Sequence, residues 1–129
     1  MLPSDAPAQV LTAFILLWVS VALGTVDALY TSGAEFSENI VAAIAVLAVI
    51  VAIESAIICL AARRHNWARW ALLAWFIAAL CLYSIDMPDQ IAPWWDVVIL
   101  VGSFLSEAIG LFILFTGSGA RWYARAPVQ

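Results

Sequence analysis

Four long apolar runs constrain the fold of this chain more than any other feature. They occupy about residues 10–30, 40–62, 67–85 and 94–115, with short polar connections between them. A bilayer core about 30 Å thick requires roughly 20 apolar residues in each helix that crosses it. Each run therefore predicts a membrane-spanning helix. The sequence predicts an all-α, four-helix transmembrane bundle in which residues 1–129 form a single domain.

The composition agrees with this fold class and excludes several functions. Hydrophobic residues make up 66% of the chain and charged residues 11%, whereas soluble domains are roughly half apolar and about a quarter charged. The predicted spans leave no room for a soluble domain or a nucleic-acid-binding surface. Residues 1–9 contain no basic side chain, which a secretory signal would carry. We therefore expect the first apolar run to be a retained helix.

The five basic residues are all arginines, and all lie at one predicted end of the bundle. Arg63, Arg64 and Arg69 lie in the hairpin between the second and third runs, and Arg121 and Arg125 follow the fourth run. The connections at the opposite end contain acids and no basic residue. Short loops rich in Arg and Lys stay on the cytoplasmic side of a membrane. The pattern predicts that the hairpin and both termini are cytoplasmic.

Tryptophan residues flank the apolar runs close to the predicted membrane surfaces. Trp is enriched at membrane–water interfaces, because its ring is largely apolar and carries one polar N–H group. Arginines beside the runs fix which end stays inside. We therefore expect the following residues to set the depth and orientation of the helices: Arg63, Arg64, Trp67, Arg69, Trp70, Trp94, Trp95, Arg121 and Trp122.

Small residues recur at intervals of three and four in three of the runs. Such faces let membrane helices approach one another closely. In the second run, Glu54 projects from the side opposite to the small-residue face, at 100° per residue. The predicted helix-packing residues are Ser20 and Gly24 in the first run, Ala48, Ala52 and Ala56 in the second, and Gly102, Ser106 and Gly110 in the fourth.

Two glutamates well inside the apolar runs are the strongest candidates for a functional site. Glu54 precedes Arg63 by nine residues, and Glu107 precedes Thr116 by nine. At about 1.5 Å per residue, both lie about 13 Å from the cytoplasmic ends of their helices. A charged acid at this depth costs about 2.5–3.5 kcal/mol, and no span contains Arg or Lys. Asp27, near the outer end of the first run, is expected to be solvated.

Three interpretations of the buried glutamates stay open. Protonated acids can form hydrogen bonds between helices and add stability alone. Acids that line a wet path can instead carry protons or cations. The third interpretation is a contact with a partner membrane protein that supplies the missing base.

Motifs for enzymatic or cofactor chemistry are absent from the sequence. It contains one histidine and two cysteines, Cys59 and Cys81, which both lie in apolar runs. It contains no cluster of metal ligands, no phosphate-binding loop, and no nucleophile with a neighbouring base. We therefore expect no catalysis, no metal and no cofactor.

Three short sequence motifs follow one another along the chain in an order that resembles that of a protein family. They are Leu16–Gly24 in the first run, Asn66–Arg69 at the hairpin, and Leu114–Gly119 followed by Arg121–Tyr123 at the end. Together they resemble a family of small, uncharacterised four-helix bacterial inner-membrane proteins. The resemblance implies four spans, cytoplasmic termini and a bacterial origin, and it implies no activity.

These observations predict a small non-enzymatic protein of the bacterial inner membrane that acts by association. Besides the lipid bilayer, its partner would be a larger membrane protein or a second copy of the chain. It would serve as an accessory subunit or as an interaction protein, for example one that gives immunity against a membrane-targeted toxin. The alternative is a proton- or cation-coupled channel or transporter, dimeric, that uses Glu54 and Glu107.

Overall fold

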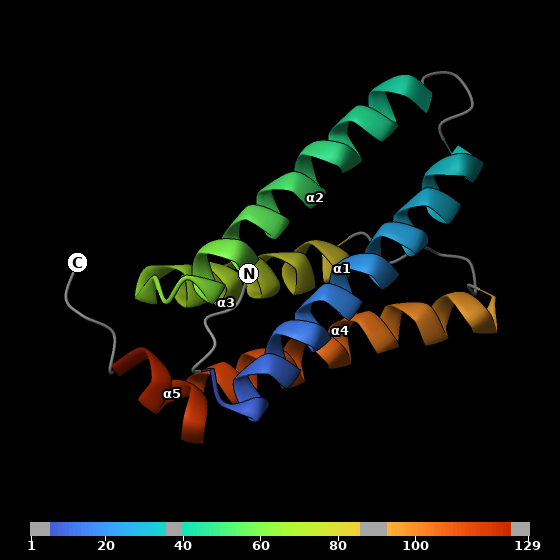
Figure 1. Ribbon diagram of the computed structural model, residues 1–129. Helices are drawn as coiled ribbons and strands as arrows, with labels where there is room; N and C mark the ends of the chain where they lie inside the picture. The colour runs from blue at the N-terminus through green and yellow to red at the C-terminus, as the bar shows by residue number, and fades with distance from the viewer. Residues whose placement is uncertain (1–5, 36–39, 86–92, 125–129) are drawn as a thin grey trace.

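The chain forms five helices in the residues that the computed structural model describes, which are 6–35, 40–85 and 93–124. All of these helices but the last are long and apolar enough to cross a membrane. The predicted all-helical class with four membrane-length helices is therefore confirmed. In chain order the helices are α1 (Ala8–Glu35), α2 (Ile40–Ala62), α3 (Asn66–Ile85), α4 (Trp94–Phe115) and α5 (Gly117–Ala124) (Figure 1).

The observed bounds agree with the prediction for α2 and α4 and differ for α1. The predicted spans at 40–62 and 94–115 coincide with α2 and α4. α1 continues to Glu35 instead of ending near residue 30. Residues 31–35 contain no proline, and their single glycine weakens a helix by only about 1 kcal/mol. The helix therefore continues beyond the apolar run.

α1 and α4 form the closest pair of helices. They approach most tightly at Gly110, where a Cβ atom would lie 3.0 Å from the carbonyl oxygen of Ala13 and 3.2 Å from Leu17 Cγ. Cβ atoms at Gly24 and Gly102 would each lie 3.5 Å from the nearest side-chain atom of the opposite helix. Gly24, Gly102 and Gly110, which the sequence predicted for packing, thus lie at the contact of these two helices.

α2 is far more exposed than α1 or α4. The buried residues of this fully described helix are Ile58 and Ala61, both near its C-terminal end. Figure 1 shows α2 diverging from α4 away from that end. The predicted packing face of α2 is exposed, so the expected contact is not made within the chain. That face consists of Ala48, Ala52 and Ala56.

A tight turn joins α2 to α3 and places Arg64 in the left-handed conformation, with φ 68°. The His65 N–H donates to the carbonyl oxygen of Leu60 at 3.2 Å, and the Arg64 N–H donates to that of Ala61 at 2.9 Å. This pair of bonds is the Schellman motif, in which glycine usually occupies the left-handed position. An arginine in that position indicates that contacts of its side chain offset the backbone strain.

α5 folds back onto the ends of the long helices. Thr116 is extended and Gly117 has φ 50°, which breaks the chain between α4 and α5. Trp122 and Tyr123 of α5 are each 4% exposed. Trp122, predicted as an anchor at the membrane surface, is thus buried within the fold, and its depth in a membrane stays a prediction. α5 turns this ring inward, where its centroid lies 6.4 Å from that of Phe14.

Two arginines hold α5 in place. Arg64 donates a hydrogen bond to the carbonyl oxygen of Trp122, and its guanidinium lies 5.0 Å from the centroid of that ring. The guanidinium of Arg69 lies 5.1 Å from the ring centroid of Tyr123. The Tyr123 hydroxyl donates to the carbonyl oxygen of Ala61 at 2.7 Å, and burial raises the pKa of this hydroxyl. Arg64 and Arg69 therefore stabilise the fold in addition to carrying charge.

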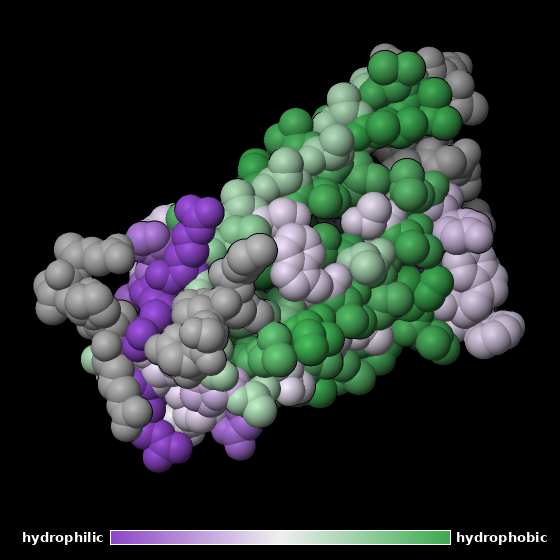
Figure 2. Space-filling model, in the orientation of Figure 1, coloured by the Kyte–Doolittle hydropathy of each residue, from purple (hydrophilic) through white to green (hydrophobic). Residues whose placement is uncertain are grey.

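Polar residues gather where α5 meets the turn between α2 and α3 (Figure 2). Arg63 and Arg121 are exposed there, and we call this the arginine end. Beyond it, the visible surface of the long helices is mostly apolar. Arg125 and most of the acidic connections lie outside the described residues. The remaining predicted anchors are exposed near one end or the other: Trp67, Trp70, Trp94 and Trp95.

Candidate functional site

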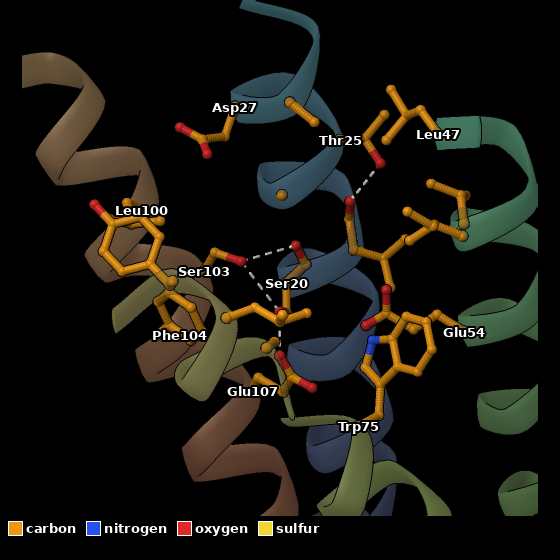
Figure 3. A pocket seen from close by; sticks show the side chains of 18 residues that line it. Ser20, Thr25, Asp27, Leu47, Glu54, Trp75, Leu100, Ser103, Phe104 and Glu107 are labelled. Atoms are coloured by element: carbon orange, nitrogen blue, oxygen red, sulfur yellow. Dashed lines mark hydrogen bonds between the residues drawn. The ribbon is translucent and has the colours of Figure 1, made fainter. Parts of the chain in front are cut away.

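Glu54 and Glu107 point into one cavity between the four long helices (Figure 3). The cavity has a volume of about 400 Å³, and α1, α2, α3 and α4 all contribute to its lining. Glu107 is 6% exposed, and Glu54 is partly buried. Their carboxyl groups are close enough to interact electrostatically. The two acids that the sequence places at equal depth therefore share one site.

Helix periodicity explains why both acids face inward. On α2, Leu47, Val51 and Glu54 follow at intervals of four and three, and all three line the cavity. On α4, Ser103 and Glu107 are four residues apart and also line it. Residues at these spacings share one face of a helix. The same register turns the alanine face of α2 away from the cavity.

Hydroxyl groups hold Glu107 at the contact between α1 and α4. Ser20 Oγ donates to Glu107 Oε2 at 3.3 Å, and Ser103 Oγ lies 3.2 Å both from the Ser20 hydroxyl and from the Ser20 carbonyl oxygen. Ser106 instead donates to the carbonyl oxygen of Ser103 in its own helix, at 2.9 Å. Ser20, predicted as a packing residue, is therefore also the partner of the buried acid.

The second carboxyl oxygen of Glu107 has no partner. Oε1 is buried and makes no hydrogen bond to any described residue. The described residues that line the cavity include no Arg, Lys or His. A buried polar atom left unpaired costs about 1–3 kcal/mol, and an unpaired charge costs considerably more. Packing among the described residues therefore does not explain why Glu107 Oε1 is buried without a hydrogen-bond partner.

A third acid lines the cavity beyond the two predicted ones. Asp27, expected to be solvated, lies near the C-terminal end of α1 and so toward the end opposite the arginines. It interacts with Asp96 of α4 through a side-chain hydrogen bond. Asp27 is therefore part of the site, a role that its position near the end of the apolar run did not predict.

Aromatic side chains form much of the remaining wall. Trp75 and Tyr83 of α3 line the cavity with Phe104 of α4, and the rings of Tyr83 and Phe104 are 6.0 Å apart between centroids. Trp75, Ala79 and Tyr83 repeat every four residues, so the sequence did place them on one face of α3. It did not show that this face turns toward the acids.

Comparisons with known proteins give no assignment for this site. The chain matches no protein-family model, no curated protein and no solved structure. The family resemblance of the three short motifs therefore stays a prediction from the sequence. Function has to be argued from the cavity itself.

Proposed function

We propose that this protein is a multi-pass protein of the bacterial cytoplasmic membrane that moves protons or cations through the cavity between the four long helices. The observation that carries the proposal is the convergence of Glu54 and Glu107 on that cavity, with Glu107 Oε1 buried and unpartnered. Ionisable side chains that face a cavity within membrane helices commonly mark proton or ion paths. The described lining of the cavity contains acids and no base, so it favours positive charge.

The alternative that both acids only join helices is a poorer explanation of the contacts. Acids in that role would have their oxygens satisfied across helix contacts, because each unpaired buried oxygen is costly. Glu107 uses one oxygen in this way, with Ser20. Among the described residues its other oxygen has no partner, and Glu54 makes no hydrogen bond. Stability alone therefore does not require either acid.

Reconstitution into liposomes tests this proposal. With a pH gradient imposed and a trapped pH dye, the wild-type protein should show a flux of protons, or of protons exchanged for K⁺ or Na⁺, that changes with pH. The titratable groups facing the cavity are Asp27, Glu54, Glu107 and Tyr83. We expect Glu54→Gln and Glu107→Gln each to lower the flux at least about tenfold, because a glutamine side chain cannot bind and release a proton as a carboxyl group does.

Folding controls make this result interpretable. Glutamine at 107 keeps an oxygen that can accept the Ser20 hydrogen bond, so the melting temperature should stay close to that of the wild type. Trp67→Leu changes an exposed side chain of α3 outside the cavity and should leave the flux unchanged. If the wild type shows no flux at any pH with any of these cations, the transport proposal is wrong.

A second candidate function is association within the membrane, and the exposed face of α2 favours it. Ala48, Ala52 and Ala56 are exposed in this chain, although small-residue faces are typical of membrane helix contacts. The partner would be a second copy or a larger membrane protein, as for an accessory subunit or an immunity protein. A dimer formed through this face is also compatible with transport.

Larger side chains on the alanine face of α2 test whether this face contacts a partner. Ala52→Leu and Ala56→Leu should abolish copurification with the partner, or shift a dimer to a monomer in light scattering, because bulk prevents close approach of the backbones. Ala78→Leu adds the same bulk at an exposed position of α3 and should change neither measurement. A wild-type monomer that copurifies with nothing would contradict this candidate.

A further inference from the structure

We infer that the preferred ligand of the cavity is a monovalent organic cation with an aromatic or similarly apolar body. This inference rests on the proposed cation-handling function and specifies its substrate class. The cavity combines two features that such a molecule requires. Carboxyl groups meet the positive charge, and aromatic rings meet the apolar body.

The charge requirement is met at Glu107. This side chain lines the cavity and is 6% exposed, and its Oε1 has no partner among the described residues. Glu54 lies close enough to interact with it electrostatically. A cation between the two carboxyl groups would satisfy the orphan oxygen and relieve their mutual repulsion. A neutral hydrogen-bond donor could satisfy the oxygen but would not relieve the repulsion, and an anion would increase that repulsion.

The wall of the cavity favours an organic cation over a bare metal ion. Trp75, Tyr83 and Phe104 contribute aromatic rings to the lining, and aromatic faces attract ammonium groups by about 0.5–2 kcal/mol. Divalent metal ions prefer about six oxygen ligands. In the described part of the chain, no group of three or more His, Cys, Asp and Glu residues is placed to hold a metal ion.

The size of the cavity and the distribution of charge along the helices agree with an organic cation as the ligand. Pockets for small organic molecules measure roughly 300–1,000 Å³, and this cavity measures about 400 Å³. Asp27 lines the cavity toward the end opposite the arginines. Arg63 and Arg121 are exposed at the arginine end, where they would repel a cation. The field along the helices therefore favours entry of a cation from the Asp27 end.

Equilibrium binding to the full-length protein in lipid nanodiscs tests the inference. The probe is benzyltrimethylammonium, compared with its neutral carbon analogue neopentylbenzene and with the anion benzylsulfonate. We expect saturable binding of the ammonium compound alone. Glu54→Gln and Glu107→Gln should each weaken this binding about tenfold or more, and Glu107→Asp should retain part of it because it keeps the charge. Equal binding of neopentylbenzene would overturn the inference.

Aromatic variants supply a second readout. Trp75→Leu should weaken binding about fivefold, whereas Trp67→Leu, at an exposed position of the same helix, should have no effect. Equal effects of the two variants would contradict a role for the cavity wall. If a flux of protons or K⁺ depends on the glutamates but the ammonium compound does not bind, this inference is wrong and the transport proposal stands. If the compound binds but no flux occurs, transport is wrong and the ligand class stands.

Discussion

Arg64 combines a strained backbone with two side-chain contacts. Its left-handed φ of 68° costs a non-glycine residue about 1–2 kcal/mol. Its side chain bonds the Trp122 carbonyl oxygen and stacks on the Trp122 ring. Nothing in the local sequence requires arginine at a position that usually favours glycine. The contact with a residue 58 positions away accounts for the strain.

Two substitutions at Arg64 separate the free-energy cost of its left-handed backbone from the stabilisation that its side chain gains by contacting Trp122. Arg64→Ala and Arg64→Gly both remove the contacts with Trp122, but only glycine relieves the left-handed strain. We expect the glycine variant to be more stable than the alanine variant by about 1 kcal/mol, measured by reversible unfolding in detergent. At the exposed Arg63, whose φ is not positive, the alanine variant should instead be more stable than the glycine variant. Glycine less stable than alanine at residue 64 would show that the turn is not formed as described.

At the scale of elements, the junction between α4 and α5 depends on one glycine. A Cβ atom at Gly119 would overlap the carbonyl oxygen of Ile113 and would lie 2.8 Å from the Cα atom of Leu114. These are backbone atoms, so they cannot move aside as a flexible side chain can. The sequence Gly117-Ser118-Gly119 is typical of a helix end. The structure shows in addition that α5 packs directly on the backbone of α4.

Gly119→Ala should therefore displace α5. Overpacking of this kind costs about 1–3 kcal/mol or more, and the displaced helix would expose Trp122. The expected results are a lower melting temperature and a shift in tryptophan fluorescence. Gly102→Ala is the matched control, because its Cβ would meet Leu23 at an ordinary 3.5 Å. Equal stability of the two variants would contradict the close contact of α5 with α4.

At the scale of the whole molecule, charge is sorted along the long helices. The described arginines lie at the turn between α2 and α3 and on or near α5, whereas Asp27 and Asp96 lie toward the other end. This distribution predicts that the arginine end is cytoplasmic. The helices themselves are compatible with either orientation, because length and hydropathy do not distinguish the two sides of a membrane.

Cysteine labelling in intact cells tests the orientation. After Cys59 and Cys81, both free and exposed, are replaced by alanine, single cysteines are introduced as Asn66→Cys, Ala124→Cys and Pro93→Cys. A membrane-impermeant maleimide should label position 93 from outside, and positions 66 and 124 only after permeabilisation. Labelling of positions 66 and 124 from opposite sides would exclude an arrangement with both on the cytoplasmic face.

The sequence alone determined where along the chain the long helices lie and which positions in them the acids occupy. An apolar run of membrane length is a local property, so the bounds of α2 and α4 could be read directly from it. The spacing along each helix also fixed which residues share a face, including Ser103 with Glu107 and Trp75 with Tyr83. These conclusions depend on helix geometry and not on what packs against the helix.

Only the tertiary structure decided which faces meet. It turned Glu54 inward and the alanine face of α2 outward, and it added Asp27 and the aromatic wall to the cavity. It also buried Trp122, which a sequence rule placed at the membrane surface. In each case the outcome depends on contacts between residues far apart in the chain. The free energy of such contacts depends on the shapes and polar groups of both partners. The sequence of one helix therefore does not predict which contacts form.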